Sequence, residues 1–276
     1  YRKAYYDCIG TVRVNADERN NIFLVDLTAP DIKSLSLSKR GHKEALLLAG
    51  VAKIDICEKE KVATRRVNVD GTQELIRQLV KEGIKPIFFS SDYVFDGKDG
   101  AYSEYASVNP IVEYGRQKAE VEAKIASITN GNYLVVRLSK VFSVTKEDNT
   151  LFDEMAYIFS SGGTVQAAFD QIFCPTFITD VVNAIIRLQT KRVTGIVNVC
   201  SPEVWSRYDL AASLAMAMGV DVARVERMPL DRIVIPKNRP KNTSMASTKA
   251  LRAGLFFTSI SSCIQRVANN WAKVTS

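Results

Sequence analysis

The sequence predicts an α/β protein built on a doubly wound parallel sheet. Segments with the pattern of strands alternate with segments with the pattern of helices through the first half of the chain. The strand-like segments at 85–90 and 133–138 are mostly apolar, as in parallel strands buried on both faces. This alternation is typical of sheets whose parallel strands are joined by crossover helices.

The first half holds most of the regular elements. Strands are expected at 7–12, 22–25, 44–49, 85–90 and 133–138, and helices at 31–39, 61–81 and 111–127. The helix at 61–81 is amphipathic, and Gly83 lies just beyond its end. Pro110 precedes the helix at 111–127, and we expect this proline in the first turn.

After residue 141 the pattern is less regular. We expect helices at 150–160, 177–190, 207–218 and near Ser247 and Ser259, a strand at 195–200, and a proline-punctuated stretch at 229–240. The 276 residues are 46% hydrophobic, which is enough for a substantial core in one large or two small domains.

Composition argues against several classes of protein. The chain has no apolar run of about 18 residues, so we expect no membrane span. Its first residues lack the apolar core of a signal peptide. The cysteines are odd in number and have no paired spacing, so we expect neither a disulfide framework nor a metal site, and a cytoplasmic location. His42 is the only histidine, which excludes most histidine-based catalysis and zinc sites.

The formal net charge of +7 allows two interpretations. A basic protein can bind nucleic acid, but the positive residues are dispersed and form no basic patch interleaved with aromatics. A basic surface that attracts an anionic cofactor and a nucleotide diphosphate explains the charge equally well. We therefore expect no nucleic-acid partner.

Tyr114 and Lys118 lie four residues apart. On a helix this spacing stacks the phenol and the ammonium on one face. A free tyrosine has a pKa of about 10, and a nearby lysine cation lowers it. The pair therefore predicts general acid–base chemistry. The spacing alone also fits a solvated helix face. Of the ten tyrosines, however, only Tyr114 has a lysine four residues on, and its helix follows a strand that ends in serines.

Ser91 supplies a third candidate catalytic residue. It lies at the end of the expected strand 85–90, and ligands of open α/β sheets bind at the carboxyl ends of the strands. Its hydroxyl could hold a substrate carbonyl that Tyr114 protonates. Simple capping of the backbone is the alternative for a serine at a strand end.

At these residues the sequence resembles a known family. The segments Ser90-Ser-Asp-Tyr-Val-Phe-Asp-Gly97 and Asn109-Pro-Ile-Val-Glu-Tyr-Gly-Arg-Gln-Lys-Ala-Glu120 are similar to the extended short-chain dehydrogenase/reductases, and among them to the dTDP-4-dehydrorhamnose reductases. Further similar stretches are 49–58, 66–71, 170–176 and 239–244. The resemblance therefore runs from about Cys8 to the last helix.

The resemblance implies a Rossmann-like fold with a smaller substrate lobe. Residues 1–145 would form the dinucleotide-binding domain and 146–276 mainly the substrate-binding lobe, with 172–200 packing back onto the first domain. Residues 7–12 would be the second strand of the sheet, and 1–6 the tail of the preceding helix. A homodimer through the helix that carries Tyr114 is also implied.

A dinucleotide fold opens with a strand and a glycine-rich turn that holds the pyrophosphate. Here Gly10 is the only glycine before Gly41, and it lies inside an expected strand. The first strand and the glycine-rich loop would then be absent. Either the sequence is truncated at its N-terminus or the lineage has lost cofactor binding. We favour truncation, because a sheet without its central strand would expose apolar edges.

The resemblance also implies cofactor-binding residues. Arg13 ends the second strand, where an arginine accommodates the extra phosphate of NADPH and an acidic residue selects NADH, so we expect NADPH, with NADH as the alternative. A plain surface arginine would look the same. The other implied contacts are Asp26 and Leu27 at the adenine, Ala49, Gly50 and Val51 at the pyrophosphate and nicotinamide, Leu138 and Ser139 at the nicotinamide, and Tyr114 and Lys118 themselves. Asn68 would orient the backbone beneath the site, or would be an ordinary helix-surface residue.

For the substrate, the resemblance implies Tyr93 and Gln171 at the sugar and Arg239 at the nucleotide diphosphate. Each could instead be structural. Lys140 stands where the family usually has an aromatic residue, and Val141-Phe142-Ser143 departs from the usual aromatic–glycine ending. These departures leave the identity of the sugar open.

The implied activity is NADPH-dependent reduction of dTDP-4-dehydro-L-rhamnose to dTDP-L-rhamnose. Tyr114 would donate the proton, Lys118 would lower its pKa and bind the nicotinamide ribose, and Ser91 would hold the carbonyl oxygen. One alternative is a non-catalytic scaffold, as in the related regulatory subunit of methionine adenosyltransferase. The other is a nucleotide-sugar epimerase or dehydratase, against which Asp92-Tyr-Val-Phe-Asp-Gly97 argues.

Overall fold

The computed structural model describes residues 8–233 and 238–272 and contains two compact units. Unit 1 comprises the described residues of Tyr1–Val94, Val112–Val136 and Arg192–Ile196. Unit 2 comprises those of Phe95–Ile111, Arg137–Lys191 and Val197–Ser276. The units interleave along the chain, unlike the predicted division at residue 145, and only 192–196 of the segment 172–200 belongs to unit 1. The assignment of a function to each domain stays a prediction.

A four-stranded sheet has the order β10–β5–β4–β3. Its strands are β3 (Glu44–Leu47), β4 (Lys85–Ser91), β5 (Leu134–Leu138) and β10 (Gly195–Val199). Strands β3 and β4 pair in parallel, with Glu44 opposite Lys85. Every residue of β4 is buried, which explains why that segment is mostly apolar.

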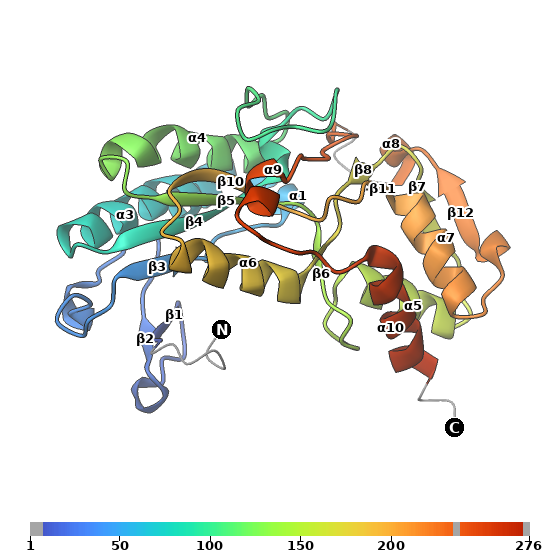
Figure 1. The fold of residues 1–276 in the computed structure, drawn as a ribbon, viewed down its shortest axis with the longest axis horizontal. Coiled ribbons are helices and arrows are strands. Elements are labelled where there is room, and N and C mark those ends of the chain that lie inside the picture. The colour runs from blue at the N-terminus through green and yellow to red at the C-terminus, as the bar shows by residue number, and fades with distance from the viewer. Residues whose placement is uncertain (1–7, 234–237, 273–276) are drawn as a thin grey trace. The chain divides into compact units, whose positions relative to one another are not determined.

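Unit 1 also contains helices and short helical turns. They are α1 (Ile54–Lys59), α2 (Lys61–Arg65), the π-helical turn η4 (Arg66–Gly71), α3 (Thr72–Lys81) and α4 (Glu113–Ile128), with the 3-10 turns η2 (Glu18–Asn20), η3 (Lys33–Leu35) and η5 (Asp92–Val94). Helices α3 and α4 lie side by side against β4 (Figure 1). Ile76 and Leu79 of α3, Val121 and Ile125 of α4, and Phe88 of β4 belong to one buried apolar cluster.

Three predicted elements of unit 1 differ in the structure. Strand β1 (Gly10–Val12) pairs in parallel with β2 (Ile22–Leu24) in a separate two-stranded sheet, so its predicted place as second strand of the main sheet is wrong. Strand partners are chosen by long-range packing, which a local pattern does not encode. The predicted helix at 31–39 is only the short turn η3, which ends at Ser36 with a left-handed φ of 46°. The predicted helix at 61–81 is α2, η4 and α3 in succession. The expected helix tail at 1–6 lies outside the described residues.

Unit 2 contains the remaining elements. They are β6 (Val141–Phe142), α5 (Leu151–Ser160), β7 (Val165–Ala168), β8 (Ile172–Phe173), β9 (Thr176–Phe177), α6 (Ile178–Thr190), β11 (Trp205–Ser206), α7 (Arg207–Ala217), η6 (Val222–Arg224), β12 (Val225–Met228), α8 (Leu230–Ile233), α9 (Thr248–Arg252) and α10 (Ile260–Ala272). Helices α5, α7 and α10 pack on one another around Phe152, Leu214 and Ile264. The sequence did not predict the parallel pair β7–β12, because its strands are short and far apart along the chain.

No helix in the described parts of the chain is both long and apolar enough to cross a membrane.

Candidate active site

Strand β4 ends in two polar residues, Ser90 and Ser91, and Asp92 follows as the first residue of η5. Ser90, Ser91 and Asp92 are all buried, and Tyr93 follows in η5. The Ser91 hydroxyl donates to Asp92 Oδ1 at 3.0 Å and accepts the N–H of Tyr93 at 3.2 Å. The strand end thus fixes the Ser91 side chain by hydrogen bonds to its own neighbours.

Helix α4 brings Tyr114 and Lys118 to this strand end. The ring of Tyr114 lies edge-on to that of Tyr93, with centroids 6.4 Å apart. The Lys118 ammonium donates to the backbone oxygen of Phe89 at 2.8 Å and lies 4.7 Å from the centroid of the Phe88 ring. Tyr93, Tyr114 and Lys118 therefore gather at the carboxyl end of β4, beside Ser91.

Burial, more than Lys118, sets the ionisation of Tyr114. Burial raises the pKa of the Tyr114 phenol above its ordinary value, the Asp92 carboxylate raises that pKa further, and a hydrogen bond with Ser91 partly opposes both. The predicted lowering of the phenol pKa is wrong, because burial and Asp92 raise it even though the Lys118 ammonium lies 5.8 Å from the centroid of the Tyr114 ring. A protonated phenol at neutral pH is the form that can donate a proton.

The pKa of Lys118 is shifted in the opposite direction, downward. Burial lowers the pKa of its ammonium to about 8, while the nearby Glu122 carboxylate opposes this shift. The group is therefore charged at neutral pH but loses its proton far more readily than an exposed lysine.

The start of α4 is held from another helix. The N–H of Glu113, the first residue of α4, donates to Glu58 Oε1 of α1 at 2.6 Å. Val112 has an extended backbone, so Pro110 lies before the helix, and its predicted place in the first turn is wrong. A side-chain carboxylate from α1 satisfies the free helix N–H and fixes where α4 begins.

The loop after β3 is clamped to Asn68. Asn68 Oδ1 accepts the N–H of Val51 at 2.7 Å, and Asn68 Nδ2 donates to the oxygen of the same residue at 2.9 Å. Gly50 has a φ of 155°, and a Cβ there would lie 2.9 Å from Asn68 Oδ1. The close approach of the Asn68 amide thus explains the glycine, and Asn68 holds the backbone of Val51. That this backbone lies beneath an active site, as the resemblance implies, stays a prediction.

The residues predicted at the adenine lie beside a cavity of unit 1. Hydrogen bonds from Thr28 hold the pKa of the Asp26 carboxyl below its usual value, and the positive charges of Arg13 and Arg66 lower it further. The residues that directly follow in the sequence, Thr28 and Ala29, line a cavity of about 660 Å³ together with Gly71 and others. Leu27, which lies between Asp26 and Thr28, is buried.

Four other predicted residues belong to unit 2. Ser139 is buried, and its hydroxyl accepts the N–H of Cys174 at 3.3 Å, while Leu138 ends β5. The backbone oxygen of Gln171 accepts the N–H of Arg207 at 2.9 Å, and Arg239 is half-buried. Their roles stay predictions.

Sequence reasoning missed three residues that the structure brings to the candidate site. Asp92 holds the Ser91 hydroxyl, Arg66 adds a second positive charge near Asp26, and Gln117 contacts Asn68. Only Asp92 had a signal in the sequence, since it directly follows the candidate serine at a strand end.

Known structures show which fold this is. The crystal structure of dTDP-4-dehydrorhamnose reductase from Bacillus anthracis str. Ames in complex with NADP superposes with a TM-score of 0.78 at 21% identity, over 92% of each chain. This similarity confirms the predicted α/β, Rossmann-like fold class.

The sequence comparisons then give the family. A family profile described as RmlD substrate binding domain matches residues 25–271, so the chain belongs to that family. The dTDP-4-dehydrorhamnose reductase of Mycolicibacterium smegmatis is 28% identical over 210 residues, covering 75% of this chain and 64% of the relative. The methionine adenosyltransferase 2 subunit beta of Bos taurus is 26% identical over 211 residues, covering 73% of this chain and 62% of the relative. The chain thus matches less than two thirds of the length of either relative.

Proposed function

We propose that this chain is an NADPH-dependent reductase of a nucleotide-linked 4-keto sugar, with dTDP-4-dehydro-L-rhamnose as substrate and dTDP-L-rhamnose as product. The observation that carries the proposal is the gathering of Tyr114 and Lys118 beside Ser91 at the carboxyl end of β4. The family and the relative from Mycolicibacterium smegmatis support the choice of substrate.

Each of these residues has one role in the proposed reaction. When bound, NADPH supplies a hydride to the C4 carbonyl. The Tyr114 phenol, kept protonated by burial, gives its proton to the carbonyl oxygen as negative charge develops there. Ser91 holds the same oxygen with its hydroxyl, which must turn from Asp92 to do so. Lys118 binds the nicotinamide ribose and stabilises the phenolate that remains.

Several parts of unit 1 fit NADPH. The loop at Ala49, Gly50 and Val51 has its backbone fixed by Asn68 and carries small side chains, which allow close approach of a flat ring. The cavity beside Asp26 could take the adenine, with the charges of Arg13 and Arg66 for a phosphate. Within residues 8–233 and 238–272 no glycine-rich turn joins a strand to a helix to hold the pyrophosphate.

The activity test measures loss of NADPH absorbance with dTDP-4-dehydro-L-rhamnose. We expect turnover in the wild type and a loss of roughly 10²–10⁴-fold in Tyr114→Phe, with the NADPH dissociation constant little changed. Tyr105→Phe is the matched control, since that side chain is 83% exposed. Full turnover in Tyr114→Phe would rule out the proposed mechanism.

A scaffold function is the second candidate, because the bovine relative is named as a subunit of methionine adenosyltransferase. The same chain would then bind a catalytic partner instead of turning over a sugar. Stable co-elution with a methionine adenosyltransferase, together with no NADPH binding, would favour this function over the reductase.

A further inference from the structure

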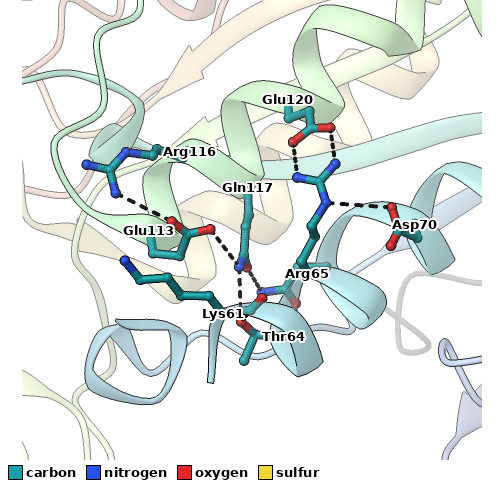
Figure 2. A network of polar contacts seen from close by, with 9 residues as sticks. Lys61, Thr64, Arg65, Asp70, Glu113, Arg116, Gln117 and Glu120 are labelled. Carbon is teal, nitrogen blue, oxygen red and sulfur yellow. Dashed lines mark hydrogen bonds and ion pairs between the residues drawn. The ribbon is translucent and has the colours of Figure 1, made fainter. Parts of the chain in front are cut away.

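Gln117 is a buried polar residue between the two candidate catalytic residues of α4. It follows Tyr114 by three positions and precedes Lys118, and it is 1% exposed. Figure 2 shows its side chain pointing from α4 toward Thr64 of α2. Burial of a carboxamide is costly unless its polar atoms are bonded, so its partners define what it does.

The Gln117 carboxamide uses both its nitrogen and its oxygen. Nε2 donates to Thr64 Oγ1 at 3.0 Å and to Glu113 Oε1 at 3.3 Å. Oε1 accepts from Asn68 Nδ2 at 2.8 Å. Thr64 and Asn68 are also buried, so water offers little replacement for these bonds.

The contact with Asn68 continues to the loop after β3. Asn68 Nδ2 donates both to Gln117 Oε1 and to the Val51 oxygen, while Asn68 Oδ1 accepts the Val51 N–H. Gln117 Oε1 can only accept, so it favours the same orientation of the Asn68 amide as the two Val51 bonds, with Nδ2 toward Gln117. A chain of hydrogen bonds therefore runs from α4 through η4 to the backbone of Val51.

We propose that Gln117 is a positioning residue that holds the loop at Ala49, Gly50 and Val51 in place relative to the acid–base helix. The role of that loop in nucleotide binding rests on the proposed function, whereas the mechanical link does not. The nearby ion pair between Arg65 and Glu120 also joins α2 to α4, but both of its side chains are partly exposed (Figure 2).

Amide hydrogen exchange of the ligand-free protein tests the link directly. In Gln117→Leu, which removes the bonds at nearly constant volume, we expect the Val51 amide to exchange about five- to tenfold faster. Glu120→Gln is the matched control, since it weakens the exposed ion pair on the same helix and should leave Val51 unchanged. Equal Val51 exchange in wild type and Gln117→Leu would overturn the proposal.

A second variant keeps the test decisive if Gln117→Leu does not fold. Gln117→Glu retains an acceptor for Asn68 but loses the donor to Thr64 and faces the carboxylate of Glu113. We expect Val51 exchange within about twofold of wild type in Gln117→Glu, even if its overall stability falls. Fast Val51 exchange in this variant would show that the acceptor at position 117 is not what holds the loop.

Nucleotide binding separates this proposal from the proposed function. If the loop lines the nucleotide, NADPH fluorescence titration should show about five- to tenfold weaker binding in Gln117→Leu and near-normal binding in Gln117→Glu. The pH profile of kcat should be unchanged in Gln117→Leu, which adds no titratable group. If the wild type binds no NADPH while Val51 exchange still responds to Gln117→Leu, the positioning role stands and the cofactor assignment fails.

Discussion

Tyr114 and Lys118 illustrate how a tertiary environment can reverse what a local spacing suggests. Their spacing predicts a cation that lowers the phenol pKa, yet burial and Asp92 raise that pKa and the ammonium is bonded to Phe89. The pair is therefore a protonated phenol beside an easily neutralised lysine. A bound substrate that draws the Ser91 hydroxyl away from Asp92 would change the surroundings of the phenol.

Lys118 should make folding stability depend on pH. Its folded pKa of about 8 lies below its ordinary value, so between these values the unfolded chain binds more protons and stability rises with pH. From pH 8 to about pH 9.5 we expect a gain of about 2 kcal/mol in the free energy of unfolding, measured with urea. Lys118→Met should lack this gain and be the more stable protein near pH 7.

The slope of unfolding free energy against pH is compared between wild type and Lys118→Met. Contributions from titrating groups that both proteins share therefore cancel. The pH range of this measurement ends below about pH 10, because the raised pKa of Tyr114 makes stability fall at higher pH. Parallel pH curves for wild type and Lys118→Met would show that Lys118 is not the responsible group.

At the scale of elements, the π-helical turn η4 has a steric reason for its glycine. A Cβ on Gly71 would lie 1.7 Å from the backbone oxygen of Leu27, so the turn and the segment that carries Asp26 and Leu27 are in direct contact. Gly71 also lines the cavity beside Thr28. A sequence pattern reveals the helix but not this contact.

We expect Gly71→Ala to destabilise the protein by about 2–3 kcal/mol, because a well-packed backbone contact must open. Without the contact, the same change in a helix would be stabilising. Gly131→Ala is the control: its φ of 82° is unfavourable for alanine but its Cβ would meet nothing within 4 Å, so a cost of about 1 kcal/mol is expected. Urea unfolding of both variants measures the difference, and equal costs would contradict the steric explanation.

At the scale of the whole molecule, the two units divide the candidate residues. Tyr114, Lys118 and Asn68 belong to unit 1, while Gln171 and Arg239 belong to unit 2. We therefore propose that unit 1 contributes most contacts to the cofactor, with Leu138 and Ser139 of unit 2 at the nicotinamide, and that unit 2 contributes most contacts to the nucleotide sugar.

Hydrogen exchange with each ligand alone tests this division. We expect NADPH to slow exchange in 26–30 and 49–51, and dTDP to slow it in the segments around Gln171 and Arg239. Protection by NADPH confined to unit 2 would contradict the assignment. The apo protein measured in parallel provides the reference for each segment.

The sequence by itself determined the alternation of strands and helices, the buried strand β4, and the candidates Ser91, Tyr114 and Lys118. These follow from local periodicity and from residues a few positions apart, which the chain encodes directly. Only the tertiary structure decided the separate pairing of β1 with β2, the start of α4 at Glu113 set by Glu58, and the raised pKa of Tyr114. It also decided the link from Gln117 through Asn68 to Val51. Each of these depends on burial and on partners far along the chain, which no local pattern specifies.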